Sequence, residues 1–81
     1  MSFTLIWNPR AMDEYRRLRQ RDAIGAKACA SAVRELADRA CPEAAVPLGG
    51  SGYYRLPVGT WRVLYRVDGD IVVVMLVGRV P

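Results

Sequence analysis

The sequence predicts an α+β fold in which a strand and a helical hairpin precede a three-stranded antiparallel meander. Three observations predict it. A run of β-forming residues at the N-terminus stops at Asn8-Pro9, apolar residues at helical spacing follow, and three strand-like runs separated by turn residues come last. The four strands are expected to form a single mixed sheet with both helices packed on one face.

The first strand is expected over Phe3 to Trp7, because this run is rich in aromatic and β-branched residues. Asparagine favours the N-cap position of a helix and proline favours the first helical position, so a helix should run from Pro9 to Gln20. Its apolar stripe consists of Met12, Tyr15 and Leu18. We expect Asp13 to pair with Arg17 one turn later.

Asp22 should cap a second helix that reaches about Arg39. Apolar residues recur there every four positions, at Ile24, Ala28, Ala32, Leu36 and Ala40. Gly25 should weaken the first turn by roughly 1 kcal/mol relative to alanine. The two helices are joined by a tight connection and therefore form a hairpin.

Residues 41–52 contain two prolines and three glycines. These residues interrupt helices and strands, so a loop is predicted here. The remaining strands are expected over Tyr53 to Val58, Trp61 to Val67 and Ile71 to Val77, with turns at Gly59-Thr60 and Asp68-Gly69. The last strand is apolar on both faces, which suits a central position, whereas Pro57 suits an edge. The economical strand order is therefore 1-4-3-2.

Composition restricts the functions that remain open. The 81 residues form one small domain, residues 1–81, with a net charge of +4 that favours an acidic or phosphate-rich partner. The chain has no histidine and only two distant cysteines, so we expect no catalytic triad, no metal site and no cofactor. No apolar run is long enough to span a membrane, and a cytoplasmic location is the expectation.

Arginines on the predicted meander are the strongest candidates for chemistry. Side chains alternate along a strand, so Arg62, Leu64 and Arg66 share one face, and Arg55 lies on the adjoining strand. A guanidinium can stabilise charge on a phosphorane, and an RNA 2′-hydroxyl can serve as the nucleophile. RNA cleavage without a metal ion, centred on Arg62 and Arg55, is therefore chemically possible. Among the aromatic residues, Tyr53 is the one most expected to be exposed.

The chain also resembles the RelE/ParE superfamily of bacterial toxins over nearly its whole length. The matching residues are Trp7-Asn8-Pro9-Arg10-Ala11, Leu48-Gly49-Gly50, Tyr54-Arg55-Leu56, Val58-Gly59, Trp61-Arg62-Val63-Leu64-Tyr65 and Val77-Gly78-Arg79. The order of the predicted elements also agrees with the fold of that family.

The resemblance to the RelE branch implies a toxin that cuts mRNA on the ribosome through 2′-hydroxyl attack and is neutralised by a cognate acidic antitoxin in a hetero-oligomer. It implies catalytic roles for Arg62, Arg55 and Arg79. Arg66 and Tyr53 are expected to be further RNA contacts because of their positions on the predicted strands. At Pro57 active RelE-like toxins often carry a basic residue. Two alternatives therefore stay open: a ParE-like inhibitor of DNA gyrase, or an inactive remnant that binds only the antitoxin.

Overall fold

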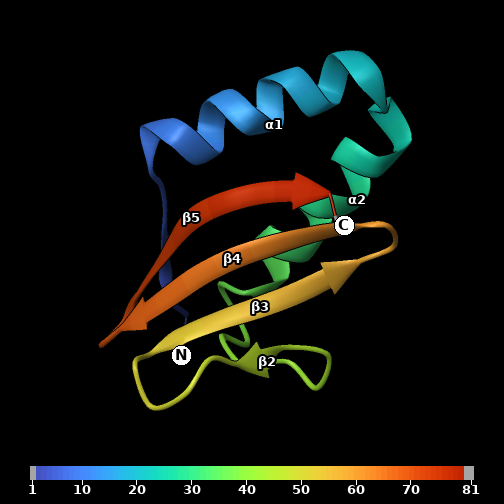
Figure 1. Ribbon diagram of the computed structural model, residues 1–81. Helices are drawn as coiled ribbons and strands as arrows, with labels where there is room; N and C mark the ends of the chain where they lie inside the picture. Colours follow the sequence, from blue (N-terminus) through green and yellow to red (C-terminus); the bar gives the residue numbers. More distant parts are fainter. Residues whose placement is uncertain (1, 80–81) are drawn as a thin grey trace.

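The protein is described over residues 2–79 by a computed structural model, which has two helices and a five-stranded mixed sheet (Figure 1). The elements are β1 (Thr4–Trp7), α1 (Pro9–Arg21), α2 (Ala23–Glu35), β2 (Val46–Pro47), β3 (Tyr53–Val58), β4 (Trp61–Asp68) and β5 (Ile71–Arg79). The sheet order is β1-β5-β4-β3-β2, with β1 parallel to β5 and the other neighbours antiparallel. The predicted α+β class and the relative order of the four predicted strands are confirmed.

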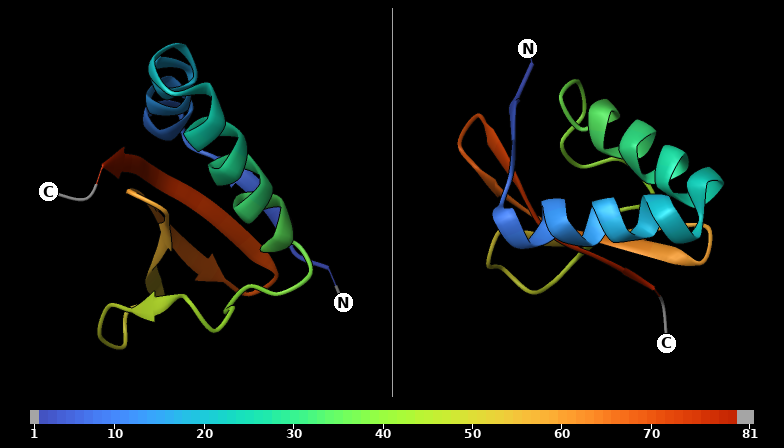
Figure 2. Two further views of the ribbon diagram at one scale, coloured as in Figure 1. Left: turned by 90° about the vertical axis from the view of Figure 1, so that its right-hand side faces the viewer. Right: turned by 90° about the horizontal axis from the view of Figure 1, so that it is seen from above.

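Both helices cover the same face of the sheet and leave the opposite face uncovered by any element of residues 2–79 (Figure 2). The core fills the space between these two layers. Its largest fully buried side chains come from α2, from the turn that follows it, and from β4 and β5: Cys29, Val33, Leu36, Val63, Tyr65, Val72 and Val74. Within the described chain no helix is long and apolar enough to cross a membrane.

Both predicted N-caps are present. Asn8 Oδ1 accepts a 2.7 Å hydrogen bond from the amide of Ala11, and Asp22 Oδ1 accepts one of 2.9 Å from the amide of Gly25. The expected pairing of Asp13 with Arg17 is wrong, because Asp13 instead lies 3.5 Å from Arg16. Residues three and four positions apart are both neighbours on a helix surface. The two pairings of an exposed aspartate therefore differ little in free energy.

The second helix is shorter than predicted. It ends at Glu35, and a turn over residues 36–38 replaces the continuation to Arg39. Leu36 is fully buried in that turn, and the carbonyl of Ala37 accepts a 2.6 Å hydrogen bond from the amide of Phe3. This hydrogen bond anchors the segment that leads into β1 to the turn after α2.

The meander contains a bulge that the sequence pattern did not predict. Leu64 pairs with Leu76 and Tyr65 pairs with Val74, so Met75 is an extra residue in β5. The bulge lets Val74 and Val77 both face the core although they lie three positions apart.

The turn between β3 and β4 is at Gly59-Thr60 as predicted, with Gly59 at a φ of 60°. The second turn is shifted by one residue from the prediction. Asp68 still belongs to β4 and pairs with Ile71, so Gly69 and Asp70 form the connection. Gly69 has a φ of 60°, which glycine adopts without strain.

The predicted loop over residues 41–52 contains the short edge strand β2. Val46 pairs with Arg55 and Pro47 with Tyr54, so β2 covers only the first half of β3. Pro57 lies beyond this pairing and opposite Arg62, where its missing amide donor breaks no bond to β2. The placement of Pro57 at an exposed edge therefore agrees with the prediction.

Candidate functional site

The uncovered face of the sheet carries three of the four predicted arginines. Residues directly opposite each other in the sheet share a face, and the core residues Val63 and Tyr65 define the helix-covered side of β4. The alternating residues Arg62, Leu64 and Arg66 therefore lie on the uncovered face. On β3 the same alternation places Tyr53, Arg55 and Pro57 on that face. We call Tyr53, Arg55, Arg62 and Arg66 the open-face cluster.

Arg62 lies between two neighbours that leave its guanidinium room. It is opposite Pro57 on β3 and Gly78 on β5, neither of which carries a long side chain. Its Nε atom is buried and has no hydrogen-bond partner among residues 2–79. A buried donor without an acceptor costs free energy, so an anion that accepts from Arg62 would be favoured there.

Arg66 and Arg55 extend the positive charge along the sheet. Arg66 is opposite Tyr53 and Val73, its Nε is likewise buried without a partner in the described chain, and its NH1 lies 3.9 Å from Asp68. Arg55 is exposed and opposite Leu64. Tyr53 is half-buried rather than fully exposed, which leaves part of its ring accessible. The open-face cluster therefore combines the positive charge of three arginines with one partly accessible aromatic ring.

Arg79 lies on the other side of the sheet from this cluster. It pairs directly with Trp61, and its guanidinium carbon is 6.0 Å from the centroid of the Trp61 ring. Trp61 faces the helices, because its indole N–H donates a 2.9 Å hydrogen bond to Asp22 Oδ2. The three arginines expected to act together are therefore divided between two faces: Arg55 and Arg62 share one, and Arg79 belongs to the other.

The sequence reasoning missed the polar site around Trp61. A cavity of about 550 Å³ lies between the second half of α1 and the ends of β4 and β5, and its lining comprises Glu14, Arg17, Leu18, Arg21, Asp22, Thr60, Trp61, Val77, Gly78 and Arg79. The pKa of Asp22 is lowered by the hydrogen bonds from Gly25 and Trp61 and by the positive charge of Arg79. The spacing of Glu14, Arg17 and Arg21 on one helix face is the sequence signal that points to this cavity.

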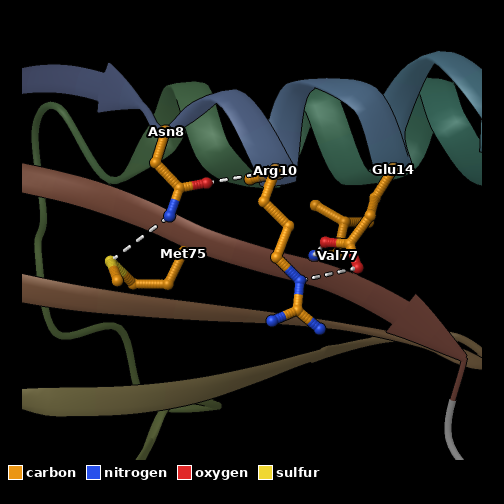
Figure 3. Close-up of polar contacts among 6 residues, drawn as sticks. Asn8, Arg10, Glu14, Met75 and Val77 are labelled. Carbon is orange, nitrogen blue, oxygen red and sulfur yellow. Dashed lines mark hydrogen bonds and ion pairs between the residues drawn. The ribbon is translucent and has the colours of Figure 1, made fainter.

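Glu14 connects α1 to β5 at the rim of the same cavity. Its Oε1 accepts a 3.0 Å hydrogen bond from the amide of Val77, and its Oε2 lies 3.6 Å from Arg10 (Figure 3). Beyond Val74 no strand of residues 2–79 pairs with β5 on this side, so Glu14 satisfies a backbone donor on a free sheet edge.

The buried Tyr65 and the half-buried Tyr54 lie side by side on the helix-covered face of the sheet. The fully buried Tyr65 donates a 2.6 Å hydrogen bond to the carbonyl of Ala40 and stacks on Tyr54 with ring centroids 5.4 Å apart. Burial, then the neighbouring Cys41 and Tyr54, raises the pKa of Tyr65. No group of three or more histidine, cysteine or acidic side chains is placed to hold a metal ion within residues 2–79.

Comparison with known proteins places this fold among small bacterial toxins. The profile of the ParE toxin family of type II toxin-antitoxin systems matches residues 5–80. The chain therefore belongs to this family, within the superfamily of RelE, YoeB and ParE toxins. No curated protein sequence matches it significantly.

Solved structures share the fold at low sequence identity. The toxin of the RelBE2 toxin-antitoxin complex from Mycobacterium tuberculosis is 22% identical with a TM-score of 0.79, over 99% of this chain and all of that one. A mutant of E. coli RelE in the free state is 23% identical with a TM-score of 0.82, over 98% and 84% of the chains. A chain of the chromosomal ParDE system of P. aeruginosa is 18% identical with a TM-score of 0.77, over 99% and 98%. These likenesses establish the fold, which RelE and ParE toxins share.

Proposed function

We propose that this toxin binds mRNA on the uncovered face of its sheet and cleaves it on the ribosome in the manner of RelE. The observation that carries the proposal is the pair of buried Nε donors of Arg62 and Arg66, which point to an acceptor that residues 2–79 do not provide. RNA phosphates are such acceptors, and arginine binds them with two parallel hydrogen bonds.

The reaction uses a nucleophile that the substrate brings. The 2′-oxygen bonds to the adjacent phosphorus, its proton passes to solvent or to a ribosomal group, and the bond from phosphorus to the 5′-oxygen breaks with protonation of that oxygen. Arginine remains protonated in proteins, so Arg62 acts by stabilising the negative charge on the phosphorane rather than by moving a proton. Arg55 and Arg66 hold neighbouring phosphates, and Tyr53 stacks on a base.

The proposed partner that controls this activity is a cognate antitoxin. Relatives of this fold are found in the RelBE and YoeB-YefM toxin-antitoxin complexes. The net charge of +4 favours an acidic partner, which would form a hetero-oligomer with the toxin and keep it inactive. Action on ribosomes and mRNA implies a cytoplasmic protein.

A second candidate function is ParE-like inhibition of DNA gyrase. Two observations favour it. The matching family profile is that of ParE, and the separation of Arg79 leaves only two of the three predicted catalytic arginines, Arg55 and Arg62, on one face with Pro57. Inhibition by binding requires no group that transfers a proton.

The deciding experiment compares the full-length toxin, freed from its antitoxin, on programmed ribosomes and on gyrase. We expect mRNA cleavage in the presence of a chelator, and Arg62→Ala should lower its rate by about 10² to 10³, the typical cost of losing one charge-stabilising donor. Arg19→Ala, on the exposed surface of α1, should cleave like the parent. Inhibited supercoiling without cleavage would establish the ParE-like function instead. Loss of both activities, with antitoxin binding retained, would identify an inactive remnant.

A further inference from the structure

The cavity between α1 and the ends of β4 and β5 has a charge pattern that suits a single carboxylate. Its two acidic residues are already engaged: Glu14 accepts from the Val77 amide and Asp22 accepts from the Gly25 amide and the Trp61 indole. Neither Arg17 nor Arg21 forms an ion pair within the described part of the chain, and both are exposed. The cavity therefore presents cationic donors that its own carboxylates do not satisfy.

Besides Thr60, Gly78 and Arg79, the remaining residues that line the cavity are apolar or aromatic. Leu18 and Val77 are almost fully buried, and Trp61 contributes its ring. A volume of about 550 Å³ accommodates a few side chains rather than a folded element. A ligand that combines an apolar side chain with a neighbouring acidic one would match both parts of the lining.

The two carboxylates also discriminate between anions. A nucleic-acid backbone would bring several negative charges close to Glu14 and Asp22, whereas a peptide brings one carboxylate and neutral backbone groups. The cavity is, in addition, on the helix side of the sheet, away from the open-face cluster. Charge and position both favour a peptide over RNA.

We propose that this cavity binds an acidic residue and an adjacent apolar residue from an extended segment of the antitoxin, with Arg17 and Arg21 holding the carboxylate. The inference rests on the proposed toxin-antitoxin function and adds the surface that is recognised. It places antitoxin binding on a different side of the sheet from the RNA contacts. The two can therefore be impaired separately.

Binding can be followed through Trp61, which lies in the cavity. In a Trp7→Phe background Trp61 is the only tryptophan, and its fluorescence should change when a short synthetic peptide alternating glutamate and leucine is added. Arg17→Glu and Arg21→Glu should each weaken binding roughly tenfold, because each reversal removes a charge-assisted contact and adds a repulsion. Arg19→Glu, which makes the same charge change outside the lining, should bind like the parent.

The proposed cognate antitoxin provides the second measurement. Arg17→Glu and Arg21→Glu should lower its affinity in competition with the parent, while Arg19→Glu and Arg62→Ala should not. Equal affinity for all four variants, with tight antitoxin binding retained, would overturn the inference and leave the proposed function intact. Failure of the antitoxin to bind the parent would instead reject the proposed partner. A Trp61 response to an RNA oligonucleotide that the peptide displaces would overturn the preference for peptide.

Discussion

Gly25 and Trp61 are packed so closely that a Cβ atom at position 25 would lie 2.7 Å from Trp61 Nε1, and it would lie nearer still to Asp22 Oδ2. The hydrogen bond from Trp61 to Asp22 thus passes directly over the first turn of α2. This glycine is needed for the contact between the helical hairpin and the start of β4, rather than being a defect in the helix.

Gly25→Ala should destabilise the protein by about 1–3 kcal/mol, the usual cost of overpacking, although alanine is the better helix former by roughly 1 kcal/mol. Urea unfolding measures the effect. Trp61→Phe removes the indole nitrogen, so the same substitution should cost less in that background. Ser31→Ala on the exposed surface of α2 is the matched control and should be neutral or slightly stabilising. A Gly25→Ala protein as stable as the parent would show that the hairpin moves away from β4 easily.

Asp22→Asn tests the charge at the same contact. Hydrogen bonds to Asp22 lower its pKa below its ordinary 3.8, so its ionised form stabilises the folded state above that pH and the benefit disappears as the pH falls through the lower folded value. Asparagine can still cap α2 and accept from Trp61. The melting temperature of Asp22→Asn should therefore fall below that of the parent at neutral pH and converge with it below pH 3.8. A difference that persists unchanged in strong acid would contradict this assignment.

Tyr65→Phe tests the buried hydroxyl that joins β4 to the segment after α2. Removing it leaves the carbonyl of Ala40 without its 2.6 Å donor, and we expect a loss of about 1–3 kcal/mol in urea unfolding. Tyr54→Phe alters the stacked partner and should cost less, since Tyr54 is only half-buried. Both variants keep the stacked rings, so equal costs for the two would contradict the assigned contribution of the hydrogen bond from Tyr65 to Ala40.

The parts of this fold that depend on local chemistry could be predicted from the sequence. Asn8 and Asp22 could be identified as N-caps because each precedes a run with helical apolar spacing. A short polar side chain at that position accepts a hydrogen bond from an amide of the first helical turn. The strand β2 was not predicted, because Val46-Pro47 takes its conformation from pairing with Tyr54 and Arg55 rather than from its own residues.

The candidate site could be predicted only where the alternation of side chains along a single strand determines which face a residue occupies. Arg62 and Arg66 follow from the period of β4 alone. The face of Arg79 depends on its register opposite Trp61, and the cavity depends on how α1 crosses β5, neither of which a local pattern contains. The bulge at Met75 likewise reverses which residues of β5 point to the core. The alternation of apolar residues along the sequence does not reveal it.

The division of the arginines between two faces predicts how RNA binding depends on salt. If the open-face cluster contacts phosphates, the logarithm of affinity for single-stranded RNA falls linearly with the logarithm of salt concentration, with a slope of about −0.7 per contact. Arg55→Gln, Arg62→Gln and Arg66→Gln should each reduce that slope by about 0.7 and weaken binding to all sequences similarly. Arg79→Gln removes the same charge from the helix-covered side and should leave the slope unchanged. Fluorescence anisotropy over a salt series measures all four variants, and a reduced slope for Arg79→Gln alone would place the RNA on the opposite face of the sheet.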